Sequence, residues 1–349
     1  MKAGVFYGKD DVRYEDVPDL ALEPGDRFDV LIKVKAGGIC GSDIHYYNGE
    51  MPPDDFVGHV LGHELAGEVV EVGEGVTNVK VGDRVGVEPL IGCGVCDWCK
   101  AGEYHICPDL RHVGYYYSGG FGEYAKAPHD KVFKLPGSIS YEAATLIDGY
   151  AVAIHALHKS ALSVADFVVV FGAGPLGLCT AQAAVAAGAR GVVIVDVIDE
   201  VLETARKAGI DEAWNSTKMD VVAEVLARTG GRGCDMVFET AGGNAPVIEP
   251  AVAMLRRGGY LGLLGIRDRM DFAAFPPQTK EITFDYIYSY AMWNYITEYE
   301  IALGLVARGD IDAEPLVTHV FPLSEIRQAF DTARDKRGSK AVKVVVKAE

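Results

Sequence analysis

The fold is decided by residues 167–177, Phe-Val-Val-Val-Phe-Gly-Ala-Gly-Pro-Leu-Gly. The apolar run predicts a short buried strand, and a helix of small residues follows it directly. Between them the glycines form the pattern G-x-G-x-x-G, which is specific when a strand precedes it and a helix follows. Gly172 would allow a tight turn, Gly174 a close approach of pyrophosphate to the backbone, and Gly177 close packing of the helix on the strand. The stretch therefore predicts a site for the phosphates of a dinucleotide.

The next apolar run, residues 192–195, predicts a second strand that ends at Asp196. This aspartate follows Gly177 by about 20 residues, the usual interval to the acidic residue of such sites. A carboxylate there can accept hydrogen bonds from both hydroxyls of an adenosine ribose and would repel a 2′-phosphate. The sequence thus predicts NAD rather than NADP. A glycine turn beside a strand-end aspartate, without any ligand, is the alternative.

Two regions of different character flank this point. After about residue 145, strands alternate with helices through residues 260–265, which predicts a parallel, doubly wound α/β sheet. Before it, short strands and glycine-rich turns, as at residues 30–34 and 79–85, predict a β-rich, barrel-like region. The length of 349 residues also favours two domains.

The charge balance excludes some partners. Acidic residues outnumber basic ones by 50 to 33, and the net charge is −17. Such a surface repels the phosphates of nucleic acids and anionic lipids. The longest apolar tracts have the length of strands, well short of the roughly 20 residues that a membrane span needs. We expect neither nucleic acid nor membrane as a partner. The first residues lack a secretory apolar stretch, which favours the cytoplasm.

Four cysteines lie close together in the β-rich region. Their spacing is C-x2-C-x2-C-x7-C, and they are Cys93, Cys96, Cys99 and Cys107. Four crowded thiolates call for a dication, and Zn²⁺ accepts four sulfurs in a closed tetrahedron. Because a closed site leaves no position for substrate, we interpret this loop as a structural zinc site.

Two other interpretations of the cysteines remain open. The last cysteine precedes a proline, as in bacterial iron–sulfur motifs, but there the final gap is three residues rather than seven. Disulfides fit poorly with an odd total of seven cysteines and no secretory signal.

A second candidate metal site combines Cys40, in Cys-Gly-Ser-Asp-Ile-His, with Gly62-His63-Glu64. A thiol, an imidazole and a carboxylate suit an open zinc site whose remaining position takes water or substrate. Taken singly, each residue has another interpretation, because a lone cysteine is usually a small buried hydrophobe and a lone histidine a satisfied polar group.

These motifs occur together in one known family. Five motifs stand in the order found in zinc-dependent medium-chain alcohol dehydrogenases. They are the sequence from Cys40 to His45, the stretch from Gly62 through Glu-Val-Val-Glu-Val-Gly, Val-Gly-Asp-Arg-Val at 81–85, the cysteine loop and the glycine pattern. The similarity covers essentially the whole chain. It resembles most the polyol (sorbitol/xylitol-like) and the butanediol or threonine dehydrogenases.

The resemblance implies a GroES-like β-barrel catalytic domain, residues 1–147 and 290–349, and a Rossmann NAD-binding domain, residues 148–289. Cys40 and His63 match the catalytic zinc ligands, and Glu64 matches a carboxylate that binds zinc directly or through water. Asp148 takes the place of a further ligand, where polyol dehydrogenases typically have Glu-Pro. Zinc there would act as a Lewis acid on the substrate hydroxyl.

Further roles follow from the same resemblance. Ser42 would hydrogen-bond the reacting hydroxyl, and His45 would complete a proton relay to solvent through the cofactor ribose, a role that its titration range suits; a histidine without a role is the alternative. The expected cofactor contacts are Gly172, Gly174, Pro175, Leu176, Gly177, Asp196, Thr240, Leu264 and Ile266. Family members are commonly tetramers, and residues 282–288 are the candidate edge strand.

The substrate is less determined. Sorbitol-type enzymes carry an arginine–tyrosine pair after the last Rossmann strand, and this chain has Ser289 before Tyr290. Because arginine is a multidentate donor, its loss puts sorbitol itself in doubt. Tyr290 and Trp293 suit a cyclic polyol, a shorter diol or an amino alcohol. We expect an NAD- and zinc-dependent enzyme that oxidises a secondary alcohol of a polyol, cyclitol or diol to the ketone. A threonine-like amino-alcohol dehydrogenase and a non-catalytic cofactor-binding protein are the alternatives.

Overall fold

The computed structural model describes residues 1–51, 56–267 and 269–348. By its internal contacts the chain forms two compact units. The first comprises Met1–Asp148, Ala291–Gly309 and Val317–Glu349, and the second Gly149–Tyr290 and Asp310–Leu316. The sequence placed all of 290–349 in the first domain, whereas Asp310–Leu316 groups with the second unit. There Leu316 is fully buried, and the Gln182 side-chain amide donates to the Asp312 carbonyl oxygen at 2.8 Å.

The first unit is built on two β-sheets. The smaller has the order β2-β1-β4 (Asp11–Asp16, Lys2–Gly8, His59–Val60). The larger has the order β10-β6-β5-β3-β20-β19, with β9 also paired to β3. Its strands are β3 Asp29–Ile39, β5 Glu64–Val72, β6 Arg84–Val87, β9 Tyr124–Pro128, β10 Val132–Lys134, β19 Val317–Pro322 and β20 Lys343–Lys347. The C-terminal strand thus completes a sheet that the N-terminal segment begins.

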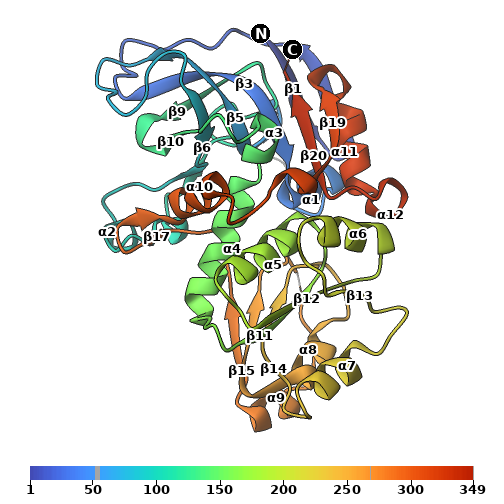
Figure 1. Ribbon diagram of the computed structural model, residues 1–349. Coiled ribbons are helices and arrows are strands. Elements are labelled where there is room, and N and C mark those ends of the chain that lie inside the picture. The colour runs from blue at the N-terminus through green and yellow to red at the C-terminus, as the bar shows by residue number, and fades with distance from the viewer. Residues whose placement is uncertain (52–55, 268, 349) are drawn as a thin grey trace. The chain divides into compact units, whose positions relative to one another are not determined.

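Short elements complete this unit. Its helices are α1 Gly41–Asn48, α2 Asp97–Lys100, α3 Tyr141–Ala144, α10 Glu298–Arg308, α11 Ile326–Arg334 and α12 Lys336–Ser339. Two small ribbons pair β7 Leu90–Ile91 with β8 Arg111–His112, and β17 Met292–Trp293 with β18 Ile296–Thr297. Helix α11 packs on β2 and β20, where Phe330 joins a core with Phe6 and Phe121 (Figure 1).

One expected strand in this unit is shorter than the sequence suggested. The alternation over residues 79–85 favoured a strand, but only Arg84–Val87 forms one. Before it Gly82 has φ 88°, and the Asp83 amide donates to the Lys80 carbonyl oxygen at 3.0 Å. The glycine in the left-handed region closes a turn that an extended strand would not allow.

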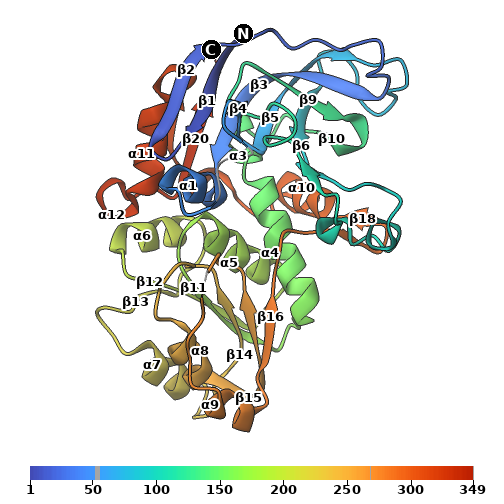
Figure 2. The same cartoon turned by 180° about the vertical axis from the view of Figure 1, so that it is seen from behind.

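The second unit is a parallel six-stranded sheet of order β13-β12-β11-β14-β15-β16. The strands are β11 Phe167–Phe171, β12 Gly191–Asp196, β13 Ala213–Asn215, β14 Cys234–Glu239, β15 Leu255–Leu263 and β16 Thr283–Tyr286. The helices are α4 Ile147–Ser160, which begins at the boundary of the units, and α5 Pro175–Ala186, α6 Asp199–Lys207, α7 Val221–Arg228, α8 Ile248–Met254 and α9 Phe275–Lys280. Helices α5 and α6 cover one side of the sheet and α7, α8 and α9 the other (Figures 1 and 2).

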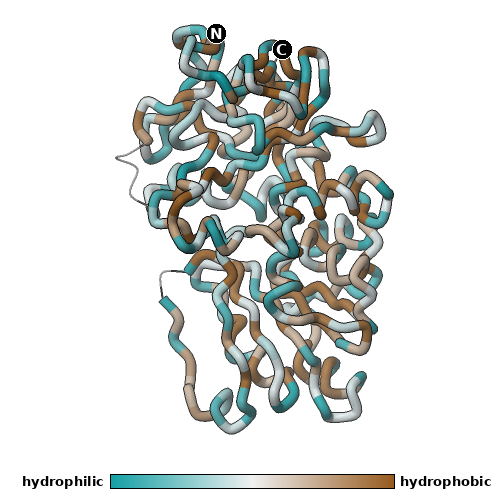
Figure 3. The backbone as a smooth tube through the Cα atoms, turned by 90° about the vertical axis from the view of Figure 1, so that its left-hand side faces the viewer, coloured by the Kyte–Doolittle hydropathy of each residue, from teal (hydrophilic) through white to brown (hydrophobic). Residues whose placement is uncertain are grey.

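This order is that of a doubly wound Rossmann sheet, as expected. The order reverses between β11 and β14, because right-handed crossovers first build the sheet one way and then the other. Ligands of such sheets bind at this reversal, outside the carboxyl ends of the strands. The central strand β11 is buried between its neighbours and reads as a continuous apolar run. Segments of hydrophobic residues alternate with segments of hydrophilic residues along the chain (Figure 3).

No helix among the described residues is long and apolar enough to cross a membrane.

Candidate metal centres and dinucleotide site

Strand pairing brings the first candidate metal ligands together. Strands β3 and β5 are antiparallel with Gly38 opposite Glu64. Cys40 lies just beyond the end of β3, and His63 just before the start of β5. Because the two strands are antiparallel neighbours, both residues lie at the same end of this strand pair. The thiol, the imidazole and the Glu64 carboxylate each have a ligand atom within 4.8 Å of the others. His63 and Glu64 are buried. A sulfur, a nitrogen and an oxygen in a partly dry site form a donor set that suits zinc.

Glu64 has a partner that the sequence did not indicate. The ammonium of Lys343, on β20, donates to Glu64 Oε2 and to the Ile39 carbonyl oxygen, at 3.3 Å for the latter. Lys343 is 1% exposed, so this is a fully buried cation. A single lysine in an apolar C-terminal strand carries no recognisable motif, and only the sheet pairing reveals its role.

Asp43 and Tyr115 surround His63. Asp43 Oδ1 lies 4.0 Å from His63 Nδ1, and its Oδ2 accepts the Cys40 backbone N–H at 2.9 Å. Burial raises the pKa of Asp43 to about 6, although the neighbouring His63 charge opposes this. The Tyr115 hydroxyl lies 3.5 Å from His63 Nδ1 and 3.4 Å from the Ser42 hydroxyl oxygen. Of the aromatic run 115–117, Tyr115 is therefore the residue at this site.

The charge around His63 is unusual for a buried imidazole. Burial disfavours its protonated form, but the charges of Cys40, Asp43 and Asp148 raise the pKa of His63 well above its ordinary value. A surplus of negative partners around a buried imidazole is the environment in which a dication would replace the proton.

Asp148 itself lies in the first turn of α4 and is buried. It is not a member of the cluster formed by Cys40, His63 and Glu64. Its influence on His63 is through charge. Its role as a ligand stays a prediction.

The four loop cysteines form a second cluster. Sγ atoms of Cys93, Cys96, Cys99 and Cys107 all lie within 4.8 Å of one another. Backbone amides point at the sulfurs: the amide of Cys96 donates to Cys93 Sγ and that of Cys99 to Cys96 Sγ, each at 3.4 Å. Hydrogen bonds from the amides of Val95 and Cys96 lower the pKa of the Cys93 thiol to about 7. This geometry suits four thiolates closed around one zinc ion.

The glycine turn of the second unit is tightly packed. Gly172 has φ 101°, and its Cβ, if present, would lie 2.9 Å from Thr240 Oγ1. A Cβ on Gly177 would lie 1.8 Å from the Gly172 carbonyl oxygen. Gly174 is the N-cap of α5, and Pro175 its first residue. The turn thus brings glycine backbone close to the N-terminus of the helix, where anions bind.

The Asp196 carboxylate accepts a hydrogen bond from the same turn. Its Oδ2 accepts the Ala173 N–H at 2.7 Å, and its Oδ1 accepts those of Val197 and Ile198 at 2.6 and 3.1 Å. A carboxylate can take up further hydrogen bonds, because each oxygen has two lone pairs.

A cavity of about 400 Å³ lies beside this turn. Gly172, Asp196 and Ala241, at a strand end expected near the cofactor, line it together with residues that the sequence did not indicate: Ser216, Met219, Asp220 and the segment Ala245 to Val247. Two carboxylates, Asp196 and Asp220, therefore border one cavity. Ser216 follows β13, the third strand, so the rule that ligands bind beyond the carboxyl ends of parallel strands would have pointed to it.

The remaining predicted cofactor residues lie at neighbouring strand ends. Thr240 follows β14, and its hydroxyl donates to the Phe171 carbonyl oxygen at 2.8 Å. Leu264 follows β15, and its amide donates to the Glu239 carbonyl oxygen at 2.8 Å. Ile266 is exposed, and its carbonyl oxygen accepts the Gly243 N–H at 2.8 Å. None of the three lines the 400 Å³ cavity, and neither do Gly174, Pro175, Leu176 and Gly177.

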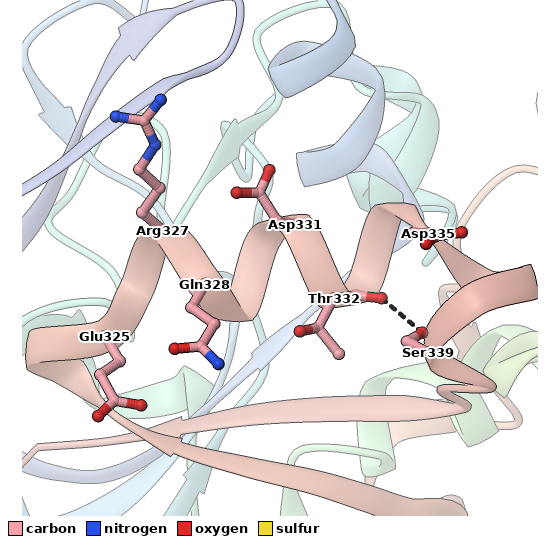
Figure 4. A pocket seen from close by; sticks show the side chains of 7 residues that line it. All are labelled: Glu325, Arg327, Gln328, Asp331, Thr332, Asp335 and Ser339. Carbon is pink, nitrogen blue, oxygen red and sulfur yellow. Dashed lines mark hydrogen bonds between the residues drawn. The ribbon is translucent and has the colours of Figure 1, made fainter.

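A larger hollow, of about 650 Å³, lies on the polar face of α11 and α12 (Figure 4). Its lining includes Arg327, Asp331 and Asp335, and the Ser339 hydroxyl donates to the Thr332 carbonyl oxygen at 2.8 Å. It contains none of the predicted site residues.

Comparison with known proteins places both units. Residues 26–137 match the family model described as "Alcohol dehydrogenase GroES-like domain", and residues 175–308 match "Zinc-binding dehydrogenase". The chain is 37% identical to a sorbitol dehydrogenase of Bacillus subtilis, over 95% of this chain and 93% of that protein. It is 34% identical to a probable D-xylulose reductase A of Aspergillus clavatus, over 97% and 95%.

A solved structure agrees with these relatives. The crystal structure of 2R,3R-butanediol dehydrogenase from Bacillus subtilis superimposes with a TM-score of 0.85 at 33% identity, covering 100% of this chain and 99% of that one. With its GroES-like and Rossmann units, two metal-type clusters and these relatives, the chain belongs to the family of zinc-binding alcohol dehydrogenases.

Proposed function

We propose that this protein is an NAD- and zinc-dependent dehydrogenase that oxidises a secondary alcohol of a polyol, cyclitol or diol to the ketone by hydride transfer. The observation that carries the proposal is the cluster of Cys40, His63 and Glu64, a donor set for an open zinc site in a chain of this family. The relatives are named sorbitol dehydrogenase, probable D-xylulose reductase and butanediol dehydrogenase, and these names support a polyol or diol as the substrate.

The residues of this site would act as follows. Cys40 and His63, with Glu64 and Asp148 nearby, would hold a zinc ion, which when bound serves as a Lewis acid for the alcohol oxygen. Asp43 Oδ1, 4.0 Å from His63 Nδ1, is too far away for a hydrogen bond and would act on the ring through its charge. Ser42 would hydrogen-bond the reacting hydroxyl, and His45 would complete the relay of its proton to solvent through the cofactor ribose. The closed cluster of four cysteines would hold a second, structural zinc ion.

We propose NAD as the cofactor, bound at the glycine turn from Gly172 to Gly177 with Thr240, Leu264 and Ile266 at the nicotinamide end. Asp196 supports the preference for NAD, and Asp220 adds a second negative charge to the same cavity. Two carboxylates would repel the 2′-phosphate of NADP.

The substrate within this class depends on few residues. Ser289 stands where sorbitol-type enzymes have arginine and has φ 54°. Tyr290 is fully buried, whereas Trp293 is about half exposed. Of the two aromatic residues, Trp293 is therefore the one able to meet a ligand in the described structure.

An NADH-release assay tests the proposal. We expect turnover with at least one of sorbitol, xylitol, galactitol, an inositol or 2,3-butanediol, and two zinc ions per chain by elemental analysis. Threonine as the best substrate would favour the amino-alcohol alternative. If no alcohol released NADH although NAD bound and both zinc ions were present, the protein would be a non-catalytic cofactor-binding member of the family. Cys40→Ser should abolish turnover while NAD binding survives.

We further propose a cytoplasmic homotetramer, with domain boundaries near residues 147 and 290. Strand β16 stands at the end of the six-stranded sheet, and an edge strand can extend a sheet into a second subunit. Light scattering on the purified protein tests the tetramer.

A further inference from the structure

The side chain of His45 has a carboxylate partner. His45 is half-buried in the last turn of α1, and its Nδ1 lies 2.5 Å from Glu50 Oε2. The other oxygen of Glu50, Oε1, accepts a hydrogen bond from the Asn48 amide at 2.9 Å. Both oxygens of an otherwise exposed carboxylate are thereby engaged, and one of them is aimed at the imidazole.

The end of α1 sets up this contact. Gly49 adopts the left-handed conformation with φ 71°, and its amide donates to the Tyr46 carbonyl oxygen at 2.9 Å. The amide of Glu50 then donates to the carbonyl oxygen of His45, also at 2.9 Å. These two bonds form a Schellman turn, which reverses the chain over the last helical turn. Glu50 therefore returns to the residue that its side chain contacts, and a glycine at position 49 makes the reversal possible.

The geometry points to Glu50 as a positioning residue that holds His45 in the Nδ1–H tautomer, so that Nε2 is the basic nitrogen of the proton relay. This inference rests on the proposed function, because the relay itself is part of that proposal. Nothing in the sequence motif Cys-Gly-Ser-Asp-Ile-His includes position 50.

The tautomer follows from the chemistry of the two groups. An ionised carboxylate only accepts hydrogen bonds, so the nitrogen that faces it must carry the hydrogen. The hydrogen bond from His45, followed by that from Asn48, lowers the pKa of Glu50, and the charge of Lys9 acts in the same direction. Glu50 is therefore ionised at neutral pH. In the neutral imidazole the second nitrogen, Nε2, then keeps its lone pair free to accept a proton.

The proton balance of the oxidation uses this arrangement. Oxidation of the alcohol transfers a hydride to NAD and releases one proton from the hydroxyl. Nε2 accepts that proton, and the imidazolium that forms lies against the Glu50 carboxylate, which stabilises its charge. The half-exposed ring then loses the proton to water, and the original tautomer is restored. A histidine oriented by a carboxylate is the arrangement that serine hydrolases use for the same purpose.

The first test measures the tautomer and needs no turnover. In protein with isotope-labelled histidine, ring ¹⁵N and ¹³C shifts report which nitrogen carries hydrogen, and His45→Asn assigns the signal. We expect the Nδ1–H form in the native chain, although free histidine favours Nε2–H. Glu50→Ala should shift the signal toward Nε2–H. Asp16→Ala, which removes an exposed carboxylate paired with Lys2, should leave it unchanged.

The second test is a double-mutant cycle. Glu50→Ala should lower kcat for alcohol oxidation about two- to fivefold, as expected for loss of one partly exposed charged contact, while the Kd for NADH stays the same. In the His45→Asn background the same substitution should cost nothing further. Glu50→Asp, which keeps the charge, should recover part of the loss.

Two results would overturn the inference. One is an Nε2–H signal for His45 in the native chain, or a signal that Glu50→Ala leaves in place. The other is an equal loss of kcat from Glu50→Ala with and without His45. If instead no alcohol were oxidised, the proposed function would fail, and the tautomer measurement would still decide the role of Glu50.

Discussion

Glu64 and Lys343 form an ion pair inside the first unit although 279 residues separate them in the chain. The pairing of β3 with both β5 and β20 brings them together, with Gly38 opposite Glu64 and Ile39 opposite Val344. Gly38 leaves room for the pair, because a Cβ there would lie 2.5 Å from Glu64 Oε2 and 2.7 Å from Lys343 Cε. One end of the chain thus supplies the counter-charge for a candidate metal ligand near the other end.

Lys343→Met should destabilise the protein strongly. It leaves the Glu64 carboxylate buried without its cation, a change that typically costs about 3–5 kcal/mol. Lys347→Met is the matched control on the same strand, because Lys347 pairs with Glu142 at the surface and such pairs contribute at most about 1 kcal/mol. Denaturant unfolding of the proteins after a chelator has removed their metal ions measures both. Equal losses for the two variants would show that the buried pair has no special role.

Cys107→Ser should reduce the zinc content from two ions per chain to one and lower the thermal midpoint. Serine is a poor ligand in a four-thiolate site, and binding of a structural metal contributes directly to folding free energy. Cys179→Ala, at a buried position of α5, is the control and should keep both zinc ions. Elemental analysis and thermal melting check this. Two ions retained in Cys107→Ser would refute a zinc site at the loop.

Asp196→Ala should weaken the preference for NAD. Removing the carboxylate takes away the expected hydrogen bonds to the ribose and part of the repulsion of a 2′-phosphate, so the ratio of kcat/KM for NAD over NADP should fall at least about tenfold. Asp199→Ala removes a nearby carboxylate that pairs with Lys218 and should leave the ratio nearly unchanged. A ratio that stays constant in Asp196→Ala would assign the preference to other residues, with Asp220 the first candidate.

Asp235 should make the second unit sensitive to acid. Its carboxylate accepts the Phe167 N–H at 2.9 Å and bonds to Arg232 and Arg256 at 2.6 and 2.7 Å. Burial alone would raise the pKa of Asp235, but these partners outweigh burial and lower it. A lowered pKa stabilises the fold above the ordinary aspartate value, and the contribution is lost as pH falls through the folded value.

Asp235→Asn should therefore cost about 1.5–3 kcal/mol at pH 7, the range for hydrogen bonds to a charged group, and progressively less below about pH 4. Unfolding free energies measured between pH 3 and pH 7 test this. A difference between the two proteins that did not change with pH would contradict a stabilising charge at Asp235.

The local features of this protein could be predicted from its sequence. They are the strand at 167–171, the glycine turn and the helix after it, and the cluster of four cysteines. Each depends on residues that are neighbours in the chain, because apolar periodicity, glycine conformation and thiolate chemistry all act over a short stretch of sequence. The turn at 80–83 could not be predicted, because alternation of side chains alone does not reveal a glycine in the left-handed conformation.

Only the tertiary structure decided which distant residues meet. Lys343 against Glu64, Tyr115 beside Ser42 and His63, and Asp220 in the cavity of Asp196 result from strand pairing and sheet order. These contacts depend on which strands lie side by side, and that choice is made by burial of the whole core rather than by any local pattern. The sequence by itself determined which reactive and metal-binding side chains the protein has, and the fold decided which charged residues lie beside them.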